Sequence, residues 1–293
     1  ALTATEGSIY GRFGYGISTR AQNVEIIADG RFKLNHEPSG TVSMADPLAI
    51  DDLRLKVFSE FHQAHRGSHN RQPWHVDFSS GRWSSQKGGP NRRIRSIVHR
   101  NDEGEPDGVV SYEIDKDFGS QITVVDMVAT TPNAEVALWE FLASVDLIET
   151  IKAPQVDPAT PLPWAVEDPR VVTFTRHTDL GWLRILDVDR AMAVRGWDHQ
   201  GSVTFHVTDS MGYAEGTWRV DVDAPGTPAT VTRIDDSTDA ATLDVAALGS
   251  LYFGMGRGFS LAAAHRITGT DEQIAAIDRM FSTVDVAHNI SEF

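Results

Sequence analysis

Residues 1–16 read ALTATEGSIYGRFGYG, with the run IYGRFGY at positions 9–15. We predict a short helix over residues 5–13 that ends at Gly14, because glycine commonly follows the C-terminus of a helix. The next residues, 15–27, read YGISTRAQNVEII and predict a β-strand. The first part of the chain is therefore expected to be a helix, a glycine turn and a strand.

Residues 29–46 are expected to be irregular, with Asp29-Gly30 and Pro38-Ser39-Gly40 as turn signals, and a domain boundary is expected near residues 38–46. A segment of mixed helices and strands follows. An amphipathic helix is expected over residues 47–65, where Leu53, Leu55, Val57, Phe58 and Phe61 recur near helical spacing. Alternating and β-branched runs predict strands, and Pro132 is tolerated in the first turn of a helix. The elements expected here are strands at 92–100, 108–115, 120–129, 148–151 and 170–176, with a helix at 133–145.

A second boundary is expected near residues 177–179, and a third segment follows it. Asp187 is a good N-cap residue and opens a helix over 187–196. The other predicted elements are strands at 181–186, 201–208, 214–223, 228–234 and 241–244, then helices at 245–253, 258–267 and 271–281. Strands and helices that mix in this way predict an α+β (α/β) fold class.

The composition excludes several classes of protein. The 293 residues are 41% hydrophobic and 23% charged, which is typical of a folded globular chain. No run approaches the roughly 20 apolar residues of a membrane-spanning helix, so we expect no membrane span. The absence of cysteine excludes disulfides, a cysteine nucleophile and thiolate metal sites.

The charge is −15, and residues 178–293 carry 8 basic and 17 acidic residues. A negative field repels phosphate backbones and attracts cations, so nucleic acid is not expected as a partner and a cationic small molecule is. Acidity that serves only solubility is the alternative.

Three local patterns could indicate binding sites, but each favours a structural role. The run GMGRG at 254–258 follows a predicted helix rather than a strand, which favours a helix–helix turn over a phosphate loop. His62 and His65 could share a helical face as metal ligands, but no carboxylate motif completes a site, and we predict no metal. The arginines at 92–100 favour a solvated or ion-paired edge over nucleic-acid binding.

The chain begins with Ala1, and no signal peptide follows it. We expect the chain to be the C-terminal part of a longer protein, and its location to be cytoplasmic.

Several runs resemble one enzyme family. The run IYGRFGY at 9–15 resembles the last helix-to-strand motif of the GNAT (Gcn5-related N-acetyltransferase) superfamily, and with TATE at 3–6 it resembles the Eis (enhanced intracellular survival) family. The runs GWLRILDV at 181–188 and LGSLYFG at 248–254 are similar to the same family. The chain also ends in Glu292-Phe293, as family members end in an acidic–aromatic pair or a bare aromatic residue. Residues 38–120 match less well.

The resemblance implies three domains. Residues 1–40 would be the remnant of a catalytic GNAT domain, residues 41–178 a central GNAT-like domain without its own active site, and residues 179–293 a sterol-carrier-protein-like domain. The family holds the pyrophosphate of acetyl-CoA on a glycine-rich loop at a helix N-terminus, and residues 1–37 contain no such loop. The isolated chain is therefore expected to have little affinity for acetyl-CoA. The family also implies self-association, commonly as a hexamer.

The resemblance assigns roles to six residues. Tyr10 would donate a proton to the leaving thiolate, and the α-carboxylate of Phe293 would act as the base through water. Glu292 would help to bind a cationic amine. The residues expected near acetyl-CoA are Thr5, Glu6 and Arg12.

The function expected is acetyl-CoA-dependent N-acetylation of cationic amines such as aminoglycosides or lysine side chains. Two alternatives stay open. A carrier of lipids or small molecules could be built from the sterol-carrier-like domain, since fold does not imply function. The chain could also be a non-catalytic oligomeric scaffold.

Overall fold

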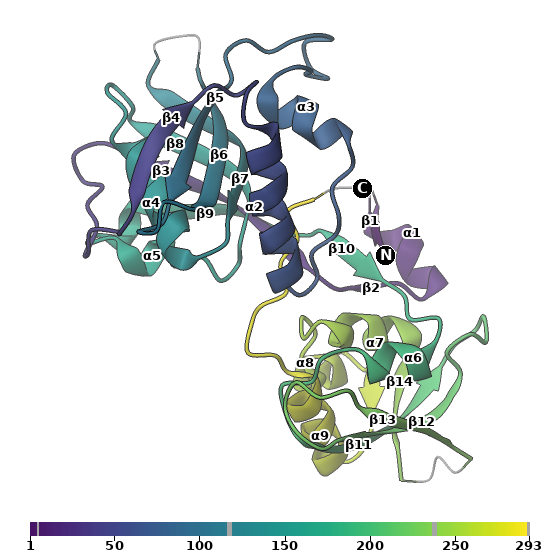
Figure 1. Ribbon diagram of the computed structural model, residues 1–293. Coiled ribbons are helices and arrows are strands. Elements are labelled where there is room, and N and C mark those ends of the chain that lie inside the picture. The colour runs from purple at the N-terminus through teal and green to yellow at the C-terminus, as the bar shows by residue number, and fades with distance from the viewer. Residues whose placement is uncertain (5, 116–118, 236–238, 292–293) are drawn as a thin grey trace. The chain divides into compact units, whose positions relative to one another are not determined.

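The computed structural model describes residues 1–4, 6–115, 119–235 and 239–291 (Figure 1). Packing divides the chain into two units, one made of Ala1–Arg20 with Asp179–Phe293, the other of Ala21–Thr178. The chain therefore passes between the units twice. The strand of Arg20–Ile27 belongs to the sheet of the second unit, so this division differs from the domains expected at 1–40, 41–178 and 179–293, which stay a prediction.

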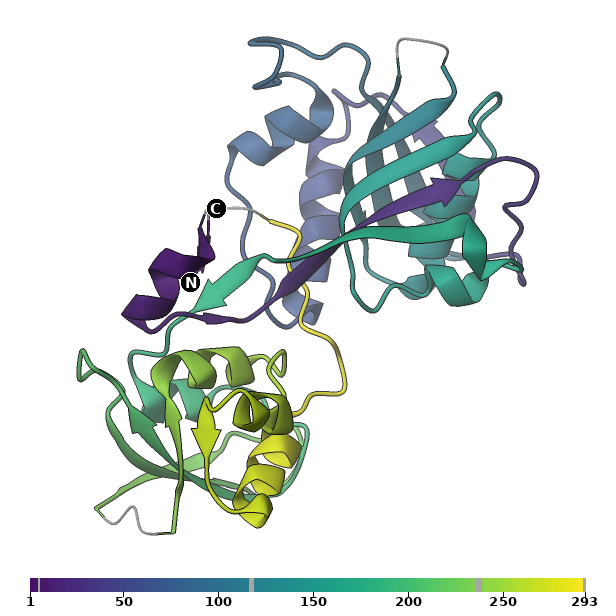
Figure 2. The ribbon, with the colours of Figure 1, turned by 180° about the vertical axis from the view of Figure 1, so that it is seen from behind.

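A seven-stranded sheet forms the unit of residues 21–178 (Figures 1 and 2). Strands β7 and β8 run parallel, with residues 121–123 opposite 150–152, and the pairs β4–β5, β5–β6, β6–β7 and β3–β8 are antiparallel. The strand order is β4 (Thr41–Ala45), β5 (Arg95–Arg100), β6 (Pro106–Ile114), β7 (Gln121–Ala129), β8 (Thr150–Val156), β3 (Arg20–Ile27) and β9 (Val172–Asp179).

Helices cover both faces of this sheet. Helix α4 (Pro132–Ala143) packs on one face, where Ile97 and Val110 join the buried cluster that contains Leu138. Helix α2 (Asp51–Ala64) packs on the other face, which carries Ser96 and Ser111. The shorter helices are α3 (Trp74–Ser80), α5 (Leu162–Ala165) and the 3-10 helix η2 (Pro169–Val171).

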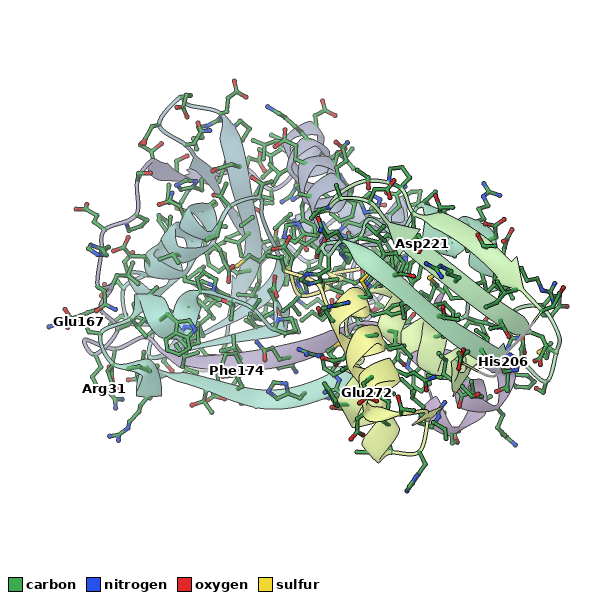
Figure 3. All side chains as sticks on the ribbon, turned by 90° about the horizontal axis from the view of Figure 1, so that it is seen from below. Arg31, Glu167, Phe174, His206, Asp221 and Glu272 are labelled. Atoms are coloured by element: carbon green, nitrogen blue, oxygen red, sulfur yellow. The ribbon has the colours of Figure 1, made fainter. Side chains whose placement is uncertain are left out.

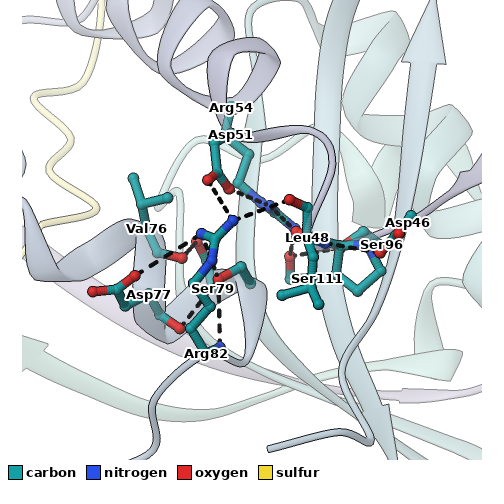
Figure 4. A network of polar contacts seen from close by, with 12 residues as sticks. Asp46, Leu48, Asp51, Arg54, Val76, Asp77, Ser79, Arg82, Ser96 and Ser111 are labelled. Carbon is teal, nitrogen blue, oxygen red and sulfur yellow. Dashed lines mark hydrogen bonds and ion pairs between the residues drawn. The ribbon is translucent and has the colours of Figure 1, made fainter. Parts of the chain in front are cut away.

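The buried face of α2 differs from the predicted one. Its buried residues are Arg54, Val57, Phe58 and Phe61, whereas Leu55 is exposed. Arg54 can take this buried position because both terminal nitrogens of its guanidinium are hydrogen-bonded: Nη1 donates to the carbonyl of Pro47 at 2.7 Å, and Nη2 to the hydroxyls of Ser96 and Ser111 at 2.7 and 3.1 Å (Figure 4). Burial lowers the pKa of Arg54.

The other unit contains two sheets. Its small sheet is antiparallel and joins the N-terminal segment to residues 181–183, since its central strand β10 (Gly181–Leu183) lies between β1 (Leu2–Thr3) and β2 (Gly16–Ile17). Helix α1 (Gly7–Tyr10) and the 3-10 helix η1 (Gly11–Phe13) connect β1 to β2.

The large sheet of this unit is covered on one face by helices (Figure 2). Val203, Phe205 and Val207 alternate inward along β11, and the rings of Trp197 and Phe205 meet that of Phe281 edge-on at 5.1 and 5.7 Å. The strand order is β13 (Thr230–Ile234), β12 (Gly216–Val222), β11 (Gly201–Thr208), β14 (Ala241–Asp244) and β15 (Ile267–Thr268), and the helices are α6 (Val188–Ala193), α7 (Val245–Tyr252), α8 (Gly258–Ala263) and α9 (Asp271–Phe281).

The other face of this sheet is polar. His206 and Asp221 on β11 and β12 are partly exposed, and Asp221 pairs with Arg219 (Figure 3). The inward alternation and this polar face explain why the sequence predicted these strands correctly.

The α+β fold class is confirmed, and so are many of the predicted elements. Strands 201–208 and 241–244 and helix 271–281 have the predicted bounds. Strand β4 falls in a stretch that was expected to be irregular, and α8 ends at Ala263 rather than residue 267. Within the described ranges, no helix combines the length and the apolar character that a bilayer crossing requires.

Candidate functional site

Tyr10 is the first residue of a tight turn formed by residues 10–15, called the Tyr10 turn below. It is the last residue of α1, and η1 continues directly to Phe13. Gly14 then adopts φ +78°, and its N–H donates to the carbonyl of Gly11 at 3.1 Å. The N–H of Tyr15 donates to the carbonyl of Tyr10 at 3.3 Å. The predicted helix end is therefore confirmed, and the left-handed conformation at residue 14 is one that glycine adopts at little cost.

The Tyr10 side chain is half-buried, and its hydroxyl has no partner among the described residues. Its ring meets that of Tyr15 edge-on, with 6.3 Å between the ring centroids. A phenol placed in this way keeps both its proton and its lone pairs available to a ligand.

The other predicted site residues are only partly described. Glu6 is exposed just before α1 and accepts a hydrogen bond from the Ser8 hydroxyl at 2.6 Å. Arg12 is exposed on η1. Thr5, Glu292 and Phe293 lie outside the described residues. The structure thus places Glu6, Tyr10 and Arg12 on one short segment.

Glycines let β2 and β10 approach α7 closely. A Cβ on Gly16 would lie 1.8 Å from the carbonyl oxygen of Ala246, and one on Gly249 would lie 2.2 Å from the carbonyl oxygen of Leu183. Only glycine fits such contacts between backbones. The strand β2, which follows the Tyr10 turn, is therefore packed directly against helix α7 of its own unit.

Sequence reasoning missed an ion pair beside the Tyr10 turn. Arg184 follows β10 and donates from Nη2 to both carboxylate oxygens of Asp209 at 2.7 and 2.8 Å, and both side chains are buried. Arg184 lies in the run GWLRILDV, one of the runs that resemble the family, so the sequence did contain a reason to consider Arg184 as a site residue. Asp209 lies 25 positions later and belongs to no motif that the sequence analysis identified.

The pKa of Asp209 is held below its ordinary value. Burial by itself would raise this pKa, but hydrogen bonds from the backbone N–H groups of Ala214 and Met211, and from the guanidinium of Arg184, outweigh burial and lower it. The carboxylate is therefore ionised at neutral pH, which keeps the pair with Arg184 charged.

The last described residues are buried. Residues 287–291 are buried although they form neither helix nor strand. The Asn289 side chain donates to the carbonyl of Ser291 at 2.6 Å and accepts from its N–H at 3.2 Å. These two bonds close a local loop at residues 289–291.

The seven-stranded sheet offers a second strand-to-helix junction, and its residues do not fit a pyrophosphate. Strand β7 ends at Ala129, and α4 begins with Pro132, which has no N–H to offer. The Thr131 side chain already accepts from the N–H of Ala134 at 3.1 Å. The carboxylate of Asp107 lies 3.4 Å from the Thr131 hydroxyl and would repel a phosphate.

Neither the histidines nor the glycine-rich run forms a site among the described residues. No three histidine or carboxylate side chains of the described chain converge as metal ligands. The Nδ1 atoms of His62 and His65 contact the Ser68 hydroxyl at 3.0 Å and the Phe61 carbonyl at 2.8 Å. The run GMGRG links α7 to α8, which confirms the helix–helix turn predicted for it.

Comparison with known proteins places this geometry in context. A family model described as an acetyltransferase (GNAT) domain matches residues 67–185, and one described as a sterol carrier protein domain matches residues 188–287. An uncharacterized N-acetyltransferase of Streptomyces avermitilis is 33% identical over 291 residues, which cover 94% of this chain and 68% of that protein. N-acetyltransferase Eis of Mycobacterium tuberculosis is 32% identical over 287 residues, which cover 94% of this chain and 66% of that protein.

Two solved structures are also similar to this chain over its whole length. The crystal structure of Eis1 from Mycobacterium abscessus superposes with a TM-score of 0.83 at 28% identity, covering 100% of this chain and 72% of that one. A GCN5-related N-acetyltransferase from Anabaena variabilis has a TM-score of 0.81 at 19% identity, which shows the fold alone, and the match covers 100% of this chain and 72% of that one. The chain spans about two thirds of the length of its curated relatives.

Proposed function

The chain belongs to the Eis family of GNAT N-acetyltransferases, and from this membership we propose that the full-length protein transfers an acetyl group from acetyl-CoA to amines of cationic substrates. Aminoglycosides and lysine side chains are the acceptor classes we propose. We also propose that the protein self-associates in a symmetric oligomer, such as the hexamer that the family resemblance implies.

Acetyl transfer needs two proton movements. The amine nitrogen attacks the thioester carbonyl, a C–N bond forms, the C–S bond breaks, and coenzyme A leaves as a thiolate that takes up a proton. We assign the proton donor to Tyr10, because a phenol holds its proton at neutral pH. The α-carboxylate of Phe293 would accept the amine proton through water.

The conformation of the Tyr10 turn is the observation that carries this proposal. The backbone around Tyr10 is closed by the bonds that Gly14 and Tyr15 donate, while the Tyr10 hydroxyl has no partner in the described part of the chain. A rigid backbone that presents a free donor suits a general acid, which must meet its substrate in one orientation.

We assign the residues that bind the acceptor amine and acetyl-CoA from the charge of this unit and from the family resemblance. Residues 178–293 carry 17 acidic and 8 basic residues, which favours cations near this unit. Glu292 would bind the cationic amine. The residues proposed near acetyl-CoA are Thr5, Glu6 and Arg12.

A lipid-carrier function receives less support. The space between the large sheet and its helices holds Trp197, Phe205 and Phe281, each at most 1% exposed and in ring contact. Side chains of the protein itself thus occupy the place where a carrier would hold an apolar ligand.

The test compares Tyr10→Phe with Tyr15→Phe in the full-length protein. Both changes remove one hydroxyl and keep the ring, so their effects on packing are matched. Thiol release from acetyl-CoA with an aminoglycoside or a lysine peptide should fall about 100-fold or more for Tyr10→Phe. Tyr15→Phe should keep near wild-type turnover. Equal rates for Tyr10→Phe and wild type would refute the role of Tyr10.

A further inference from the structure

Arg184 joins the Tyr10 turn to the sterol-carrier-like part of the same unit. Its Nη1 donates to the backbone carbonyl of Phe13, the last residue of η1, across 171 positions of sequence. A Cβ on Gly14 would lie 2.0 Å from the same nitrogen, so the guanidinium lies directly against the turn. One arginine therefore contacts two consecutive residues of the segment that closes behind Tyr10.

The other end of the guanidinium is held firmly. Nη2 donates to both carboxylate oxygens of Asp209, whose side chain is fully buried. The carboxylate also accepts from the backbone N–H groups of Met211 and Ala214, each at 3.0 Å. Asp209 thus has its acceptors fixed from two sides, and it fixes the plane of the Arg184 guanidinium in turn.

We propose that Arg184, held by Asp209, is a positioning residue for acetyl transfer, because it locks the turn at Phe13 and Gly14 and so sets the direction in which Tyr10 presents its hydroxyl. The inference rests on the function proposed above. It also gives a physical role to the arginine of the run GWLRILDV at 181–188.

Lysine cannot replace this arginine in both of its contacts. The planar fork of arginine reaches the Phe13 carbonyl with one nitrogen while another nitrogen bonds the carboxylate. An ammonium is a single point charge, so Arg184→Lys should keep the attraction to Asp209 and lose the bond to the turn. This variant separates the positioning of the turn from the burial of charge.

The first test is kinetic and uses the full-length protein. In Arg184→Lys and Arg184→Ala we expect kcat to fall about 10- to 100-fold with the KM for acetyl-CoA nearly unchanged. Arg219→Ala is the matched control, because Arg219 also pairs with an aspartate of this unit, Asp221, but is exposed. Its kcat should equal that of wild type.

A double variant distinguishes positioning from general damage. If Arg184 acts through Tyr10, adding Arg184→Lys to Tyr10→Phe should reduce kcat by less than about threefold, because the two losses are not additive. The same 10- to 100-fold loss in both backgrounds would overturn the inference, since it would place Arg184 outside the action of Tyr10.

Hydrogen exchange supplies a readout that does not depend on turnover. The amides of Gly14 and Tyr15 should exchange faster in Arg184→Lys than in wild type, while those of β11 and β12 should not change. Unchanged exchange at residues 14–15 would overturn the inference even if kcat fell. A wild-type protein without turnover would overturn the proposed function and the catalytic part of this inference, whereas the exchange rates would still report whether Arg184 holds the turn.

Discussion

Replacement of Gly16 by alanine should detach the N-terminal segment from the unit on which it packs. The new Cβ would lie 1.8 Å from the carbonyl oxygen of Ala246 and 2.6 Å from the Ser250 hydroxyl. Ordinary van der Waals contact begins near 3.4 Å, so β2 and α7 would have to move apart by about 1.6 Å. The Ala246 oxygen belongs to a helix backbone and cannot turn away as a side chain would.

The size of the effect follows from the kind of contact. Overpacking a core with one added methyl typically costs about 1–3 kcal/mol, and a clash with helix backbone belongs at the upper end of that range. For a unit of this size, a loss of about 3 kcal/mol should lower the melting temperature by roughly 10 °C. We expect this fall in calorimetry or in melting followed by circular dichroism.

Gly11→Ala is the matched control on the same segment. Gly11 has helical angles, φ −55° and ψ −36°, and a Cβ there would meet nothing within 4 Å. Alanine at this position should leave stability unchanged or raise it by about 0.5–1 kcal/mol. A Gly16→Ala protein that melts like wild type, or a Gly11→Ala protein that loses as much stability as Gly16→Ala, would refute the reasoning.

Two further predictions concern the buried ion pair of Arg71 with Asp126 and the end of the chain. Arg71 donates from Nη1 and Nη2 to the two carboxylate oxygens of Asp126 at 3.0 and 2.6 Å. Burial by itself would raise the pKa of Asp126, but Arg71, His75 and Arg54 outweigh it and hold the pKa below its ordinary value. The stabilisation is therefore present above the unfolded pKa of about 3.9 and lost as the pH falls through the folded pKa. Asp126→Asn should cost about 3–5 kcal/mol in urea unfolding at pH 7 and less in acid, whereas an equal loss at both pH values would contradict this. One residue appended after Phe293 should strongly reduce kcat, and unchanged thiol release would remove the carboxylate from the mechanism.

Local sequence predicted most of the elements and the turn at the proposed site. The sequence predicted β11 and α9 with their observed bounds, and Gly14 predicted the end of the first helix. Each of these signals is carried by residues within about one turn or one strand of each other. The family resemblance came from equally short runs, and the comparisons with known proteins support it.

The predictions from sequence failed where residues far apart in the chain determine the burial of a side chain or the pairing of a strand. Arg54 takes a buried position on α2 because Ser96 and Ser111, on strands β5 and β6, accept hydrogen bonds from its Nη2, while Leu55 is exposed. Helical spacing alone favours the apolar residue at such a position. Strand β4 was missed because its residues are mostly exposed, and its pairing with β5 defines it as a strand.

The sequence by itself determined the α+β class, the helix, turn and strand that carry Tyr10, and the membership of the Eis family. Tertiary structure alone decided what holds that turn in place. The bond from Arg184 to Phe13 joins residues 171 positions apart, and the close contact of Gly16 with Ala246 joins residues still further apart. Periodicity and turn chemistry act between neighbours, whereas these contacts exist only once the chain has folded and brought its two ends into one unit.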